Sequence, residues 1–195
     1  MLTQSILAES ISLYERNSHT TLRAAREAIL PEPISLSFCT SQVTENGIKE
    51  LADTLPTGEK KEDELSEFIY VFRLSIKSQV KTEELLAAFI AARDLQCSTE
   101  YNGKKNLCRP NAILEISQAL YVGRSYKPRE RFKQHLRDST SGTYAIHFAT
   151  WATELDATVD FHLYRFSDLG DRVVQLIEDG LWDKLKPLLG KRGER

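Results

Sequence analysis

The stretch YVGRSYKPRERFKQHL, residues 121–136, decides the fold that the sequence predicts. Its first residues are typical of a strand that ends at Gly123, where the backbone turns or approaches another group closely because glycine has no side chain. A basic helix is predicted to follow at once, over residues 127–139, and Pro128 is tolerated in its first turn. The end of a strand therefore lies directly before the start of a helix.

The predicted helix carries two polar side chains on one face and two apolar ones beside them. Arg131 and His135 are four residues apart and share a face, while Phe132 and Leu136 form an apolar stripe that docks the helix. The strand end thus presents Tyr121 beside a guanidinium and an imidazole. Arginine grips a phosphate with two parallel hydrogen bonds, and histidine donates to phosphate or transfers a proton.

The chain is slightly acidic overall but has a basic segment. Its net charge of −2 argues against a general nucleic-acid coat. Between residues 121 and 137, only Glu130 opposes the basic side chains, which are Arg124, Lys127, Arg129, Arg131, Lys133 and Arg137. Such a patch suggests a local polyanion site, because neutralising phosphates supplies most nucleic-acid affinity. A solvated helix face is the alternative, and charge alone favours it.

The composition predicts a globular protein with no membrane partner and a cytoplasmic location. Hydrophobic residues make up 41% of the chain and charged residues 28%. No apolar run approaches the roughly 20 residues that span a bilayer. The N-terminus lacks the basic lead-in of a secretory signal. The cysteines form no CxxC pair, so reduced thiols are expected rather than zinc ligands or disulfides.

Residues 1–60 are predicted to form a mostly helical N-terminal extension. The expected elements are helices over residues 3–16 and 20–29, a strand over 34–39 and a helix over 44–54. The charged, turn-rich segment LPTGEKKEDE, residues 55–64, marks the domain boundary. A specificity element, a dimer arm and a docking site for a partner are all open interpretations of this extension.

Residues 66–195 are predicted to form the main domain, of the α/β class in its α+β form, with a small three-stranded antiparallel sheet flanked by helices. The expected strands lie within residues 67–76, 113–125 and 157–166. The expected helices cover residues 81–95, 127–139, 144–155 and 171–186, the last with Asp171 as its N-cap. The first of these helices belongs to an insertion at about 77–112, and packing, substrate shaping or dimerisation is its expected role.

Glu178 lies on an apolar face of the last predicted helix. Val174 precedes it by four residues, and Leu181 and Trp182 follow it by three and four. A carboxylate in such surroundings must be paired, protonated or bound to a cation, because an isolated buried charge is unfavourable. A salt bridge or a position near water is favoured by these residues alone, and a divalent metal is the third interpretation.

Taken together, these features resemble the GIY-YIG nuclease family over roughly residues 66–190. Tyr121-Val122-Gly123 is similar to the second tyrosine motif of the family, and Arg131 and His135 match the residues of the helix that follows it. Phe68-Ile69-Tyr70 stands for the first motif, and Glu178 matches the metal-binding glutamate of a late helix. Tyr144 falls where many members have another tyrosine or histidine.

The chain departs from the family pattern at three places. Phe68 stands where the first motif has glycine, and the gap from Tyr70 to Tyr121 is far longer than the usual tight hairpin. The family usually has an asparagine shortly after the glutamate helix, where this chain has Gly190 and Lys191. The resemblance therefore gives Lys191 a contact to phosphate in place of that asparagine, or leaves the role unfilled.

The resemblance implies a metal-dependent endonuclease that hydrolyses phosphodiester bonds in DNA, of the restriction, defence or repair kind. Glu178 would hold one Mg²⁺ or Mn²⁺ ion per site. Tyr70 would deprotonate the attacking water with help from Tyr121, provided that nearby cations lower a tyrosine pKa of about 10. Arg131 would stabilise the transition state. The implied phosphate contacts and proton relays are His135, Tyr144, Arg124, Lys127 and Lys191.

Two other functions remain open. One is a catalytically silent GIY-YIG-like module that binds DNA, and the other is a protein-interaction module that uses the N-terminal helices. If their role is purely structural, Tyr70 and Tyr121 are aromatic residues of the sheet whose hydroxyls reach the rim of the domain. A homodimer is a further expectation, because a nuclease with one site that cuts both strands often needs two copies.

Overall fold

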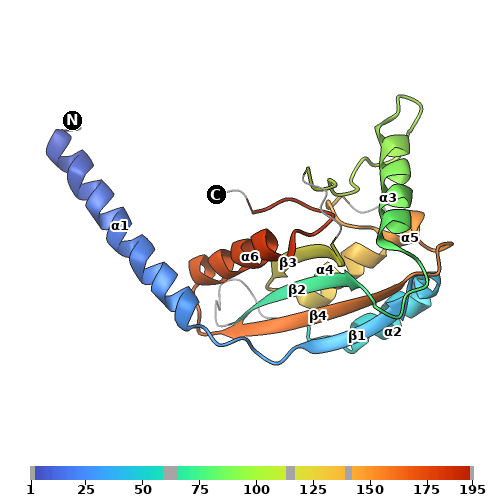
Figure 1. The fold of residues 1–195 in the computed structure, drawn as a ribbon, viewed down its shortest axis with the longest axis horizontal. Coiled ribbons are helices and arrows are strands. Elements are labelled where there is room, and N and C mark those ends of the chain that lie inside the picture. Colours follow the sequence, from blue (N-terminus) through green and yellow to red (C-terminus); the bar gives the residue numbers. More distant parts are fainter. Residues whose placement is uncertain (1–2, 59–65, 113–116, 139–141, 194–195) are drawn as a thin grey trace.

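The computed structural model describes residues 3–58, 66–112, 117–138 and 142–193, and shows an α+β fold (Figure 1). Within these residues there is one four-stranded antiparallel sheet with the strand order β1-β4-β2-β3. The strands are β1 (Ile34–Cys39), β2 (Ser66–Leu74), β3 (Ala119–Ser125) and β4 (Thr158–Ser167). The α+β class is confirmed, whereas the prediction of three strands is wrong.

The fourth strand is β1, which lies before the predicted domain boundary. The alternation of ISLSFC identified it as a strand but did not identify its neighbour. β4 has ten residues and pairs with β2 along one side and with β1 along the other, so that Ile34 lies opposite Leu163. Residues 34–39, assigned by the sequence to the N-terminal extension, are therefore part of the same sheet as the main domain.

Six α-helices occur in the described part of the chain. They are α1 (Gln4–Glu27), α2 (Glu45–Asp53), α3 (Thr82–Cys97), α4 (Pro128–Leu136), α5 (Phe148–Trp151) and α6 (Asp171–Leu185), and a 3₁₀ turn covers Thr40–Gln42. The two helices expected over 3–16 and 20–29 are one continuous helix, since the residues between them include neither glycine nor proline. None of these helices is long and apolar enough to cross a membrane.

The helix expected over residues 144–155 is much shorter, and His147 explains its late start. The backbone of His147 is left-handed, with φ +54°, which a regular α-helix does not accommodate. Its ring nitrogens lie 3.2 Å from the carbonyl oxygen of Arg137 and 2.9 Å from that of Thr143. These contacts hold the loop before α5 in a non-helical shape, so that the helix begins only at Phe148.

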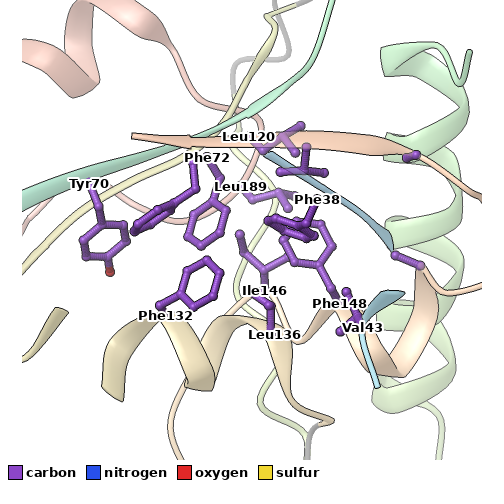
Figure 2. Close-up of a cluster of buried hydrophobic side chains, with 14 of the residues drawn as sticks. Phe38, Val43, Tyr70, Phe72, Leu120, Phe132, Leu136, Ile146, Phe148 and Leu189 are labelled. Atoms are coloured by element: carbon purple, nitrogen blue, oxygen red, sulfur yellow. The ribbon is translucent and has the colours of Figure 1, made fainter. Parts of the chain in front are cut away.

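Two helices pack against opposite faces of the sheet and position the site. Successive residues of β2 point to opposite faces. Phe72 stacks on Phe132 of α4 in the main core, in which Tyr70 lies at one end (Figure 2). Ile69 belongs to a smaller cluster with Val174 of α6. The residues on one face of β2 thus meet α4, and those on the other face meet α6.

Candidate active site

Four of the predicted site residues are in contact where β2, β3 and α4 meet. Arg131 donates from Nε to the Tyr70 hydroxyl oxygen at 3.1 Å and from Nη2 to that of Tyr121 at 3.5 Å. His135 Nε2 lies 3.1 Å from the same Tyr70 oxygen. The two tyrosine rings are parallel, with centroids 6.1 Å apart. Residues that are up to 65 positions apart along the chain therefore form one cluster, the tyrosine–arginine cluster.

Gly123 is required by this cluster, because the tyrosines leave no room for a side chain. A Cβ atom at position 123 would lie 2.5 Å from the Tyr70 hydroxyl oxygen and 2.9 Å from Cε1 of Tyr121. Real Cβ atoms do not approach other atoms so closely. Gly190 makes a similar approach from the segment after α6, where a Cβ would lie 2.8 Å from the Tyr121 ring. The sequence anticipated a close approach at Gly123 but not the group that approaches.

The imidazole of His135 is neutral and donates to Tyr70. Burial lowers the pKa of His135 well below its ordinary value, and Arg131 lowers this pKa further. The backbone N–H of Ile146 donates to Nδ1 at 3.2 Å. In a neutral ring the proton must then be on Nε2, which faces the Tyr70 oxygen. Tyr70 thus accepts from both Arg131 and His135, and its own proton is left to point elsewhere.

The pKa values of both tyrosines lie above the ordinary value. Burial raises the pKa of Tyr70 and that of Tyr121, and the positive charge of Arg131 lowers them by less. Arg131 acts in the direction that the sequence suggested, but desolvation of the phenolate outweighs it. The exposed fraction of Tyr70 is only 2%, so its hydroxyl stays protonated until a further cation or a donor arrives.

Glu178 is held by a salt bridge on the α6 side of the sheet. Arg124 Nε lies 3.2 Å from its Oε2 atom. Burial raises the pKa of Glu178 to about 7, and Arg124 opposes this shift. Of the three interpretations left open by the sequence, pairing with a basic residue is the one present in this structure. The negative charge of Glu178 also raises the pKa of Tyr70, although by less than burial does.

Arg124 joins Glu178 to two acidic residues that sequence reasoning missed. Its Nη1 atom lies 2.6 Å from Glu67 and 2.7 Å from Asp171. Glu67 is 3% exposed, and its Oε2 atom has no hydrogen-bond partner among the described residues. Asp171 was predicted as the N-cap of α6, but it is the first residue of the helix, and Gly170 is the N-cap. The sequence feature that could have indicated this network is Glu67, a charged residue at the start of the apolar segment EFIYVF.

One open pocket at the end of β3 connects the α4 side of the sheet with the α6 side. Its volume is about 520 Å³. It is lined by Glu67, Arg124, Ser125, Tyr126, Lys127, Glu130, Arg131, Gln134 and Asp171. Arg131 of the tyrosine–arginine cluster and Arg124 of the acidic network therefore line the same pocket.

The remaining predicted residues lie around this centre. Lys127 is exposed and lines the pocket just before α4. Tyr144 contacts Arg131 through its backbone oxygen, at 3.0 Å from Nη2, whereas its side chain is 62% exposed. Lys191 is exposed and follows Gly190, which lies against the Tyr121 ring. The structure thus brings Tyr144 to the cluster through its main chain.

Glu178 and Glu67 are the carboxylates of this site that could hold a divalent cation. No group of three or more His, Cys, Asp or Glu residues within the described ranges is arranged to hold a metal ion. Mg²⁺ does not require such a group, because it usually keeps several waters and takes one or two carboxylates. In this structure both carboxylates bind the guanidinium of Arg124, and the Oε2 atom of Glu67 has no hydrogen-bond partner among the described residues.

Comparison of the chain with protein-family models, with curated proteins and with solved structures found no match.

Proposed function

We propose that this protein is a metal-dependent endonuclease that hydrolyses phosphodiester bonds in DNA and resembles GIY-YIG enzymes. The observation that carries the proposal is the convergence of Arg131 and His135 on the Tyr70 hydroxyl, with Arg131 also donating to Tyr121. A purely structural role does not require two tyrosine hydroxyls to share one arginine beside a pocket lined by further cations. Cationic donors around a hydroxyl that transfers a proton suit phosphoryl chemistry.

Phosphate binding is the first step of the proposed mechanism. Arg124, Lys127 and Arg131 line one pocket and offer positive charge to the oxygens of a phosphodiester. Arg131 is already oriented by Tyr70, Tyr121 and the Tyr144 carbonyl, so its guanidinium meets the developing charge without reorganisation.

Proton transfer is assigned to Tyr70. Tyr70 would first lose its own proton to solvent, once a bound cation offsets the burial that raises its pKa. Hydrogen bonds donated by Arg131 and His135 would hold the resulting phenolate, which takes a proton from the attacking water. A divalent cation, Mg²⁺ or Mn²⁺, supplies Lewis-acid stabilisation of the phosphate when bound, and Glu178 is the residue that would hold it. Arg124 must release Glu178 for this, and a phosphate in the pocket competes for the same guanidinium.

A second candidate function is a DNA-binding module without catalysis. It is favoured by the salt bridge between Arg124 and Glu178, which already neutralises the carboxylate, and by the small exposed fraction of Tyr70. In that case the pocket binds phosphate, and no bond is broken. Both functions share DNA binding that weakens with salt, because each depends on lysine and arginine contacts.

Cleavage of supercoiled and linear DNA in Mg²⁺, Mn²⁺ or EDTA tests the proposal. We expect cutting that requires metal and that is lost in Glu178→Gln. Asp183→Asn is the matched control, since it makes the same chemical change on the same helix at an exposed position and is expected to cut normally. Cutting that survives in Glu178→Gln would overturn the proposed metal site. Salt-sensitive binding without cutting in any metal would select the second function.

A further inference from the structure

The helix α1 extends away from the rest of the molecule (Figure 1) and has no buried residue among its 24. Its N-terminal half nevertheless carries large apolar side chains. Their exposed fractions range from 44% to 64%, and the residues are Ile6, Leu7, Ile11, Leu13 and Tyr14. Isolated helices are marginal in water and gain most of their stability from packing an apolar face. An uncovered apolar face of this length therefore calls for a partner.

The apolar side of α1 continues the side that meets α6. Tyr14 and Thr21 line a groove of about 470 Å³ between α1 and α6. Leu7 precedes Tyr14 by seven residues, which is two helical turns, so both side chains lie on the same side of the helix. Ile6 and Leu13 are also seven residues apart and run beside them. The side that meets α6 near the C-terminal end of α1 thus continues, exposed, towards its N-terminal end.

The charges that border this apolar side are complementary to those of a second α1. Glu9 and Arg16 are seven residues apart and lie on the edge next to Ile6 and Leu13. In an antiparallel pair related by a two-fold axis between residues 12 and 13, Glu9 of each copy faces Arg16 of the other. The same axis brings Leu13 of the two copies together at the centre of the contact. A self-complementary surface of this kind suits a two-fold symmetric dimer.

We infer that α1 is a dimerisation arm that packs antiparallel against α1 of a second copy of this chain. The polar side of α1 supports a protein partner rather than a membrane surface. Membrane-surface helices have a polar face rich in lysine and arginine. Here three acidic residues balance three basic ones, namely Glu9, Glu15 and Glu27 against Arg16, Arg23 and Arg26. This inference does not depend on the proposed nuclease activity.

Two single charge reversals, tested separately and mixed, examine both the dimer and its direction. Glu9→Arg places arginine against Arg16 of the partner copy, and Arg16→Glu places glutamate against Glu9. In sedimentation velocity of the full chain we expect each variant alone to dimerise roughly tenfold more weakly than the parent. An equimolar mixture is expected to recover the parent affinity, because in the mixed dimer the arginines of one variant face the glutamates of the other.

Leu13→Asp with Ala8→Asp as its control tests the apolar contact. Both positions are exposed and lie outside the core, so neither change should unfold the protein, which thermal unfolding checks. We expect Leu13→Asp to be monomeric and Ala8→Asp, which points away from both the apolar side and the Glu9 and Arg16 edge, to dimerise like the parent. A parent protein that remains monomeric up to about 100 μM overturns the inference. Charge variants that dimerise as tightly alone as the parent overturn the antiparallel arrangement.

Discussion

Replacing Gly123 with alanine is expected to destabilise the fold, although alanine normally stabilises a strand relative to glycine. The new Cβ would approach the Tyr70 oxygen at 2.5 Å, its Cζ at 2.8 Å and Tyr121 Cε1 at 2.9 Å. A flexible side chain would move aside, but the Tyr70 oxygen is held by Arg131 and by His135. Overpacking of this kind costs about 1–3 kcal/mol of unfolding free energy.

Urea unfolding of Gly123→Ala beside Gly180→Ala measures this effect. Gly180 is an exposed residue within α6, and a Cβ there has no atom within 4 Å. Gly180→Ala is therefore expected to gain about 0.5–1 kcal/mol, since glycine is unfavourable inside a helix. The two alanine substitutions thus have opposite expected signs. This contrast separates crowding by the tyrosines from the general effect of removing a glycine.

Tyr70→Phe supplies the second arm of a double-mutant cycle with Gly123→Ala. Phenylalanine lacks the oxygen that is nearest to the new Cβ, and its ring is no longer tied to Arg131 and His135. The destabilisation caused by Gly123→Ala should therefore shrink by about 1 kcal/mol in the Tyr70→Phe background. If Gly123→Ala were neutral or stabilising in the parent, the tyrosine–arginine cluster would not be rigid, and the proposed orientation of Tyr70 would fail.

Three further predictions concern charge. The pKa of Glu178 is raised from 4.5 to about 7, so the folded state binds this proton more tightly than the unfolded state. The free energy of unfolding therefore falls as pH rises from 4.5 to 7. In urea unfolding at pH 5 and pH 8, Glu178→Gln should remove roughly 3 kcal/mol or less of that fall. The pKa of His135 is depressed, so the free energy of unfolding falls as pH falls below the ordinary histidine pKa of 6.5. His135→Gln keeps a donor towards Tyr70, and its free energy of unfolding should depend less on pH in the acid range. Lys127→Ala should reduce the salt dependence of DNA binding by about one phosphate contact, whereas the equally exposed Lys49→Ala on α2 should leave that slope unchanged.

The local part of the site was accessible from the sequence because it depends on spacing within one helix and one strand. Arg131 and His135 had to share a helix face, and Tyr121 had to lie near the start of that helix. The salt bridge of Glu178 was one of three open alternatives, since apolar spacing shows that a carboxylate needs a partner without showing which partner. Arg124 is 54 positions away, and only the fold brings it there.

The remaining differences arise from tertiary contacts that have no local signature. The strand pattern of ISLSFC was visible, but the sequence does not show that this strand pairs with β4, which also pairs with β2. The late start of α5, after His147, depends on backbone carbonyls that are four and ten residues away from His147. Glu67 is buried and its Oε2 atom has no hydrogen-bond partner among the described residues, and this burial cannot be derived from its position in the chain.

The alternation of β3 explains how one strand serves both sides of the site. Tyr121 and Gly123 face α4 and the tyrosine–arginine cluster, while Arg124, the next residue, points to the other face and binds Glu178. Because β3 is an edge strand, the pocket at its end is open to both sides. Under the proposed function, a phosphate in this pocket would contact Arg131 and compete with Glu178 for Arg124. Binding of the substrate and release of the carboxylate would then be coupled, because both depend on the same guanidinium.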